Sequence, residues 1–152
     1  MLFLATDHRG LKLKNQLKNW LIEKKIPFKD LGAYEYDGGD DYPAFAKLLC
    51  EQVLGRERKS SFPTEETHRG VIFCGSGAGV SIACNKIKGI RSAIGFNHTQ
   101  VQSFTSHDHV NVLAIAADYT TKFKCFQLVK SFLKTKFNQE EKYIKRLQKI
   151  ES

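Results

Sequence analysis

The stretch from Val71 to Lys86, VIFCGSGAGVSIACNK, is the clearest indication of how this chain folds. It begins with an apolar run typical of a buried strand and ends with the spacing of an amphipathic helix. Between the two, three glycines alternate with small residues directly after Cys74. Glycine allows the tight turn that leads from a strand into a helix. The stretch therefore predicts a strand, a glycine-rich turn and a helix, with a thiol where the strand ends.

The alternation of strand and helix continues on both sides of this stretch. Apolar runs predict strands at 2–5, 26–31, 70–73, 91–96 and 111–116. Helical spacing follows each of them, at 13–21, 43–53, 80–87, 97–107 and 126–137. Strands that alternate with helices of this length form βαβ units with right-handed crossovers. We therefore expect an α/β fold with a five-stranded parallel sheet.

The 152 residues favour one domain over residues 1–152. The polar segment 55–67 contains Pro63 and is expected to be a surface loop. The amphipathic segment 139–150 follows the last strand, where little of the sheet remains to be covered. We expect this last helix to pack either on a second subunit or on its own domain.

Composition narrows the possible classes of protein. A hydrophobic fraction of 41% and a charged fraction of 26% indicate a globular protein, and no apolar run approaches the roughly 20 residues that cross a bilayer. The N-terminus reaches Asp7 too early for a signal peptide, so we expect a cytoplasmic protein without a membrane partner. The net charge of +8 is spread along the predicted helices, and no nucleic-acid-binding motif is present. This pattern favours a solvated basic surface, or one that attracts small anionic substrates, over a surface that binds nucleic acid.

Polar residues follow the predicted strands, and the carboxyl ends of parallel strands meet at one edge of a sheet. The segments concerned are Thr6-Asp7-His8, 37–43, 74–79, Asn97-His98 and Ala117-Asp118. We therefore expect a small-molecule site at this edge. A dinucleotide fingerprint is not complete, since Val80 or Ile82 stands where the third glycine is needed, and the Lys-Ser/Thr of a P-loop is missing.

What remains is a nest of backbone amides at a helix N-terminus, with Cys74 beside it. Such a nest and the helix dipole favour negative charge, including an ionised thiol. A thiolate next to an oxyanion site can transfer acyl groups or remove a proton beside a carbonyl, and the absence of cysteine-protease signatures argues against acyl transfer. The other three cysteines lack metal-binding spacing and are expected to be small core residues: Cys50, Cys84 and Cys125.

The ordered set of motifs resembles the type B ribose-5-phosphate isomerase family, which also includes the subunits of galactose-6-phosphate isomerase. The match runs nearly from end to end, and segment 55–67 is an insertion in it. The matching motifs are Asp7-His8-x-Gly10, Asp30-Leu-Gly32, Asp41-Tyr-Pro43, Cys74-Gly-Ser-Gly-x-Gly79, Ser81-Ile-Ala-x-Asn-Lys86, Gly89-Ile-Arg91 and His107-x-x-x-Asn-Val-Leu113.

This resemblance implies a Rossmann-like three-layer α/β/α sandwich and an aldose–ketose isomerase that acts on ribose 5-phosphate. It also implies a homodimer or homotetramer with sites at the subunit interface, and neither a metal nor another cofactor. Cys74 matches the base that moves a proton between C2 and C1 of an enediolate. Ser76 and the amides of Gly75, Gly77 and Gly79 would hold the oxyanion.

The resemblance also assigns the remaining site residues. His107 matches the histidine that opens the sugar ring, with Asp7 as its partner carboxylate, and neutral imidazole near pH 7 suits this role. Asp7 could equally be the N-cap of the first helix, and the two roles are compatible. The residues that would contact sugar hydroxyls or phosphate are His8, Tyr42, Asn111, Lys142 and Arg146.

Two positions depart from the family pattern. Asp118 stands where the family has a phosphate-binding arginine, and Lys142 replaces another arginine, although lysine binds phosphate only as a point charge. A carboxylate close to a phosphate repels it. Either His8 and nearby lysines compensate, which we favour, or the substrate is galactose 6-phosphate, allose 6-phosphate or an unphosphorylated sugar. A non-catalytic sugar-phosphate-binding subunit is a further alternative, and the intact catalytic matches speak against it.

Overall fold

Five parallel strands form one sheet in the computed structural model, which describes residues 1–55 and 68–152. The strands are β1 (Leu2–Thr6), β2 (Phe28–Asp30), β3 (Arg69–Cys74), β4 (Ser92–Ile94) and β5 (Val112–Ala116). Their order across the sheet is β2-β1-β3-β5-β4, and every pair is parallel. The predicted parallel sheet is thus confirmed, while the loop expected at 55–67 falls, except for Gly55, outside the described residues.

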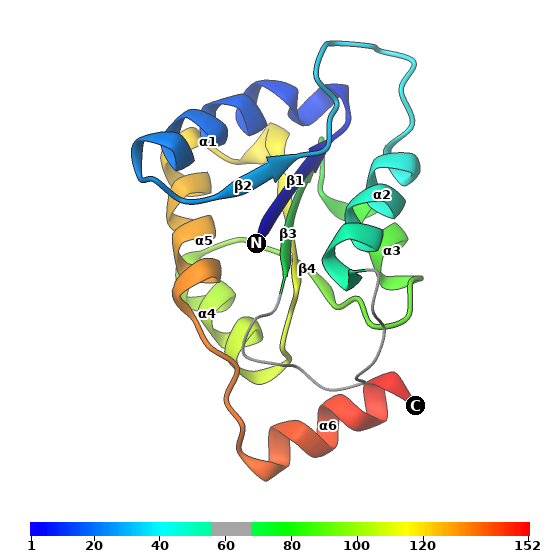
Figure 1. Ribbon diagram of the computed structural model, residues 1–152, viewed down its shortest axis with the longest axis vertical. Helices are drawn as coiled ribbons and strands as arrows, with labels where there is room; N and C mark the ends of the chain where they lie inside the picture. Colours follow the sequence, from blue (N-terminus) through cyan, green and yellow to red (C-terminus); the bar gives the residue numbers. More distant parts are fainter. Residues whose placement is uncertain (56–67) are drawn as a thin grey trace.

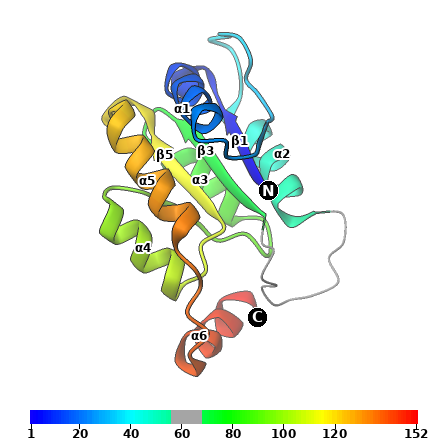
Figure 2. The same ribbon diagram turned by 60° about the vertical axis from the view of Figure 1, so that its left-hand side comes forward.

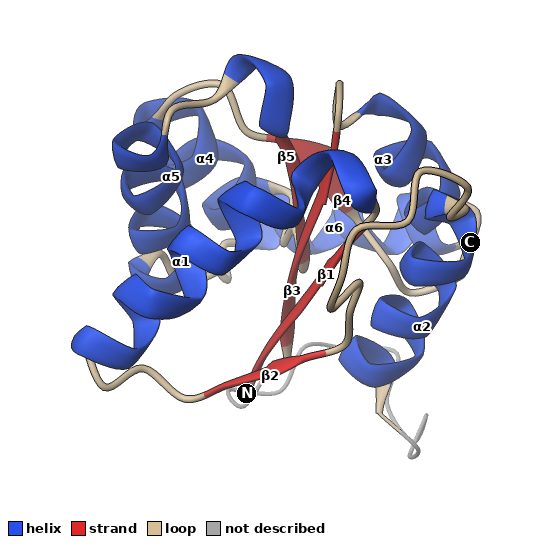
Figure 3. Ribbon diagram, turned by 90° about the horizontal axis from the view of Figure 1, so that it is seen from above, coloured by secondary structure: helices blue, strands red, loops and turns tan. Residues whose placement is uncertain are grey.

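Helices cover both faces of this sheet, as Figure 3 shows. Alternate residues of each strand point to opposite faces, so the core divides into two clusters. One cluster packs under α1 (Leu11–Glu23), α4 (His98–His107) and α5 (Lys122–Lys134). The other packs under α2 (Tyr42–Leu54) and α3 (Ala78–Asn85). The predicted three-layer α/β/α sandwich is confirmed.

The strand order reverses between β1 and β3, and this reversal positions the site. The segment after β1 forms η1 (His8–Gly10) and leads to α1 on one face, whereas the segment after β3 leads to α3 on the other face. A third segment, η2 (Ala117–Tyr119), follows β5, the neighbour of β3. Ligands of open parallel sheets bind in the crevice that such a reversal leaves at the carboxyl ends of the strands.

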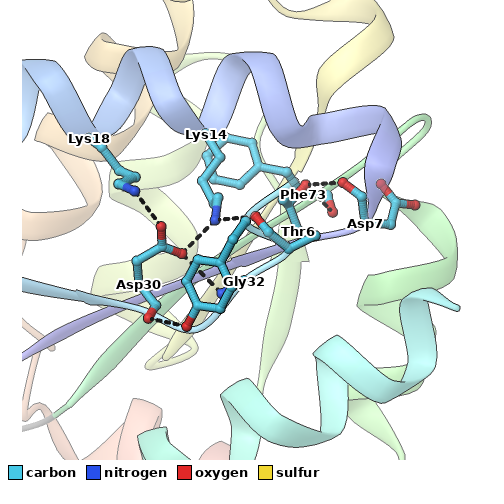
Figure 4. A network of polar contacts seen from close by, with 9 residues as sticks. Thr6, Asp7, Lys14, Lys18, Asp30, Gly32 and Phe73 are labelled. Carbon is cyan, nitrogen blue, oxygen red and sulfur yellow. Dashed lines mark hydrogen bonds and ion pairs between the residues drawn. The ribbon is translucent and has the colours of Figure 1, made fainter. Parts of the chain in front are cut away.

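A buried lysine ties α1 to the end of β2 and the residues that follow it (Figure 4). The Lys14 side chain is fully buried, and its ammonium donates to Asp30 Oδ1 at 2.5 Å and to the carbonyl of Ala33 at 2.8 Å. Lys18 donates to the second oxygen of Asp30. Burial raises the pKa of Asp30, but the hydrogen bonds from Lys14, Lys18 and Gly32 together hold it below its ordinary value. The Asp30-Leu-Gly32 motif therefore anchors a buried charge.

The last helix, α6 (Glu141–Glu151), lies apart from the two layers, beyond the amino ends of the strands (Figures 1 and 2). Its Tyr143 and Leu147 are buried, and the Tyr143 ring stacks on His107 with 4.5 Å between ring centroids. Arg91 forms an ion pair with Glu151. These contacts lie within one chain, and the packing of α6 on a second subunit stays a prediction.

Candidate active site

Cys74 is the last residue of β3, and its side chain belongs to the cluster under α2 and α3. It retains 8% exposure, whereas Cys50, Cys84 and Cys125 have none. Burial raises the pKa of Cys125 to about 12, and a hydrogen bond with Cys84 together with burial raises the pKa of Cys50. The thiols of Cys50 and Cys125 therefore stay protonated in the core. Cys74 is the thiol that lies at the carboxyl ends of the strands.

The glycine-rich turn after Cys74 forms the predicted nest. Gly77 has a φ of 74°, which only glycine adopts readily, and α3 begins at the next residue. The Ser76 hydroxyl accepts a hydrogen bond from the amide of Ala78 at 3.2 Å, so its own hydrogen remains available to a ligand. The first amides of a helix have no acceptor within it. Donors suited to an oxyanion are therefore present beside the thiol.

Tyr42, the first residue of α2, closes one side of the nest. A Cβ atom on Gly79 would lie only 2.7 Å from Tyr42 Cζ and 3.0 Å from its hydroxyl. The absence of a side chain at Gly79 therefore lets the ring approach the nest. Tyr42 is 38% exposed, and its hydroxyl lies beside Gly79.

The segment after β1 brings Asp7 and His8 to the same edge. Asp7 is buried, and its Oδ1 accepts from the amides of Arg9 (3.0 Å) and Gly10 (3.3 Å). It therefore caps the short helix η1, whereas the N-cap of α1 is Gly10. His8 Nδ1 lies 2.6 Å from Asp40 Oδ1. The second oxygen of Asp40 is buried without a hydrogen-bond partner among the described residues. Asp40 thus orients the His8 ring, and sequence reasoning did not assign it this role.

Asp118 does not stand alone at this edge. Its Oδ2 forms an ion pair with Arg9 Nη2, and its amide donates to the Gly75 carbonyl at 3.1 Å. The pKa of Arg9 is raised, first by the hydrogen bond and attraction to Asp118 and to a smaller extent by Asp7 and Cys74. The repulsive carboxylate inferred from the sequence therefore has a partner cation. Arg9 could have been noticed as the variable residue inside the Asp7-His8-x-Gly10 motif.

Four other predicted site residues lie at the amino ends of the strands, opposite the carboxyl ends where Cys74 lies. Asn111 precedes β5, and its carbonyl accepts from the amide of Gly70 at the start of β3. Cys74 lies four residues further along β3, which corresponds to about 13 Å. The helix α4 begins at the carboxyl edge and ends with His107 at the amino edge, where α6 carries Lys142 and Arg146 on either side of the buried Tyr143.

The Asn111 side chain is held by hydrogen bonds within its own chain, and its contact with substrate stays a prediction. Its Oδ1 accepts from the amide of Arg91 at 2.8 Å, and its Nδ2 donates to the carbonyl of Gly89 at 2.9 Å. The side chain is buried and holds the turn before β4 in place. Within one chain His107 also does not meet Asp7, so their partnership stays a prediction that concerns two copies of the chain.

No group of three His, Cys, Asp or Glu side chains in residues 1–55 and 68–152 is arranged to hold a metal ion. None of the helices in the described part of the chain is both long and apolar enough to span a membrane.

Comparison with known proteins agrees with this arrangement. The family model described as Ribose/Galactose Isomerase matches residues 2–150. The chain belongs to the ribose/galactose isomerase family. A probable ribose-5-phosphate isomerase B of Mycoplasma genitalium is 34% identical over 149 residues, 98% of this chain and 92% of that protein. A putative sugar phosphate isomerase of Bacillus subtilis is 31% identical over 134 residues, 88% of this chain and 84% of that protein.

Solved structures of the ribose/galactose isomerase family share the whole fold. Ribose-5-phosphate isomerase B of Mycoplasma genitalium with bound ribulose-5-phosphate superposes with a TM-score of 0.86, at 32% identity over 98% of this chain and 92% of that one. The Thermotoga maritima ribose 5-phosphate isomerase superposes with a TM-score of 0.87, at 31% identity over 99% and 96%. In this family member, one chain brings Cys74, Ser76, Tyr42, Asp7 and His8 to one edge of the sheet.

Proposed function

We propose that the protein is an aldose–ketose isomerase that interconverts ribose 5-phosphate and ribulose 5-phosphate. The observation that carries this proposal is a thiol with residual exposure beside a nest of amides at the carboxyl end of β3. Membership of the ribose/galactose isomerase family supports it. The bound ribulose-5-phosphate in the Mycoplasma genitalium relative supports the same substrate.

The reaction moves one proton between neighbouring carbons. The thiolate of Cys74 takes the proton from C2 of the open-chain aldose, and the electron pair of that C–H bond forms the C1–C2 double bond of an enediolate. Negative charge then develops on the O1 oxygen, where Ser76 and the amides of the nest donate hydrogen bonds. The O2 hydroxyl gives its proton to O1, and the Cys74 thiol returns its proton to C1. The ketose carbonyl is then at C2, and the enzyme is unchanged.

A second copy of the chain would complete the site. His107, Lys142 and Arg146 lie at the amino edge of the sheet, and α4 alone separates its two ends by about 15 Å. No rearrangement of side chains brings them to Cys74. A two-fold symmetric dimer that sets the amino edge of one copy against the carboxyl edge of the other would create two equal sites. We propose a homo-oligomer of this kind, acting in the cytoplasm.

The first experiment tests the base. Purified protein is mixed with ribose 5-phosphate, and the formation of ribulose 5-phosphate is followed together with proton exchange at C2. Cys74→Ala should lower the activity by about 100- to 10,000-fold, which is what a general base typically contributes. Cys125→Ala removes a buried thiol of the core and should stay close to the wild-type rate. Equal activity of Cys74→Ala and the wild type would refute the assignment.

The second experiment tests whether the site is shared between copies. Cys74→Ala and His107→Ala are each purified, mixed, and allowed to exchange subunits. A mixed dimer contains one intact site and one doubly altered site, so random exchange should restore about a quarter of the wild-type activity. If Cys74 and His107 acted within one chain, no activity would return.

A further inference from the structure

Arg9 and Asp118 meet directly above the backbone that carries the nest. A Cβ atom on Gly75 would lie 2.9 Å from Arg9 Nε and 2.9 Å from Asp118 Oδ2. The two side chains come from η1 and η2, which follow different strands. The guanidinium is thereby placed over Gly75, the residue between Cys74 and Ser76.

The pair is too exposed for a role in stability to explain it. The Arg9 side chain is 55% exposed and the Asp118 side chain 35% exposed, and ion pairs in such positions contribute little to folding. Asp118 occupies one donor of the guanidinium, which carries five N–H groups. Arg9 is therefore held in position by one hydrogen bond, and its remaining donors are open to a ligand.

Cys74 and Arg9 lie toward opposite sides of the sheet, so they would contact different ends of a bound sugar phosphate. Cys74 faces the side of the sheet under α2 and α3, whereas η1 leads to α1 on the opposite side. A substrate lying across the end of β3 would have its reacting carbons toward the thiol and its far end toward Arg9. A planar guanidinium donates two parallel hydrogen bonds to a phosphate, which suits the charged end of the substrate.

We propose that Arg9 binds the phosphate group of the substrate, with Asp118 fixing the guanidinium over Gly75. This inference rests on the proposed isomerase function, because it assigns the charged end of that substrate. It also explains how a carboxylate can stand at position 118, where it would repel an anionic ligand if it had no partner. The cation at this edge is then supplied by the segment after β1 and oriented by the segment after β5.

The test compares four proteins: the wild type, Arg9→Gln, Lys12→Gln and the double variant Arg9→Gln with Asp118→Asn. Lys12 is an exposed cation in the first turn of α1, so its variant removes the same charge nearby. Binding of inorganic phosphate is measured by calorimetry, without turnover, and kcat and KM are measured with ribose 5-phosphate. Arg9→Gln should weaken phosphate binding and raise KM by about 10- to 100-fold, with kcat changed less than about twofold. Lys12→Gln should resemble the wild type.

The double variant separates direct binding from simple neutralisation of Asp118. If Arg9 donates to the phosphate, binding stays at least about tenfold weaker after the carboxylate is removed. Recovery of wild-type affinity would mean that Arg9 only screens Asp118, and it would overturn the proposal. A loss of kcat at unchanged KM would overturn it too, since Arg9 would then act on Cys74. Should Arg9→Gln fail to fold, Arg9→Lys replaces it, and unchanged phosphate affinity there would reject the two-donor contact.

The two proposals can fail separately. Wild-type protein that binds phosphate through Arg9 but does not isomerise ribose 5-phosphate would refute the proposed function and retain this site. Isomerisation with the same KM in wild type and Arg9→Gln would retain the function and refute the site.

Discussion

His109 should make the stability of this protein fall in mild acid. The side chain is 7% exposed, and its Nδ1 accepts a hydrogen bond from Arg91 Nη2 at 2.8 Å. Burial, followed by the charges of Arg91 and Arg69, lowers the pKa of His109 from 6.5 to about 4. The other groups that face this cluster are the Phe137 ring, 4.8 Å from the imidazole centroid, and Glu151, which pairs with Arg91. Protonation would place a third cation here and break the bond to Arg91.

The sign and size of the effect follow from the difference between the two states. The unfolded chain takes up the His109 proton as pH falls through 6.5, whereas the folded chain takes it up near 4. The stabilising contribution of the neutral ring is therefore complete above pH 6.5 and is lost progressively between pH 6.5 and 4. Lowering the pKa by this amount corresponds to about 3 kcal/mol of unfolding free energy.

The variant His109→Asn isolates the contribution of His109 to the unfolding free energy. His109 has a φ of 50°, a left-handed conformation that asparagine tolerates, and an amide oxygen can accept from Arg91 without titrating. The unfolding free energies of both proteins are measured in urea from pH 7.5 to 4. The wild type should lose about 3 kcal/mol more than the variant over this range. Comparing the two proteins cancels the contribution of the carboxylates. Parallel curves would refute the reasoning.

Three further substitutions test the geometry around the edge. Asp30→Asn removes the counterion of buried Lys14 and should lower the unfolding free energy in urea by about 3–5 kcal/mol; a loss below about 1 kcal/mol would mean that Lys14 is not held as a charge. Gly10→Ala places a Cβ 2.4 Å from Phe73 Cβ in the buried interior and should cost about 3 kcal/mol in the same measurement. Gly79→Ala pushes instead on the exposed ring of Tyr42. It should keep the unfolding free energy within about 1 kcal/mol of the wild type, because alanine favours the helix. Its KM for ribose 5-phosphate should nevertheless rise severalfold, and an unchanged KM would separate Tyr42 from the substrate.

The sheet and the nest could be predicted because they depend on local patterns. The central strands β1, β3 and β5 are buried on both faces, so they appear as continuous apolar runs. The outer strands β2 and β4 are only partly buried, and each proved shorter than its apolar run. The nest followed from glycines between a strand and a helix. Its position followed from the general rule for parallel sheets.

Pairings between distant side chains could not be predicted in this way. Arg9 and Asp118 are 109 positions apart, and nothing in the local sequence of either residue indicates the other. The effect of Asp118 on an anionic ligand was consequently inferred from one charge alone. In the structure the Asp118 carboxylate forms an ion pair with Arg9. Its effect on an anionic ligand therefore depends on the orientation of the Arg9 guanidinium. The contribution of a charged residue to a site has a definite sign only once its partner is known.

The direction of each strand determines at which end of the sheet its flanking residues lie. A residue that follows a parallel strand lies at the carboxyl edge of the sheet, and a residue that precedes one lies at the amino edge. Cys74 ends β3, whereas His107 and Asn111 stand just before β5. Strand direction alone therefore predicts that Cys74 and His107 cannot meet in one chain.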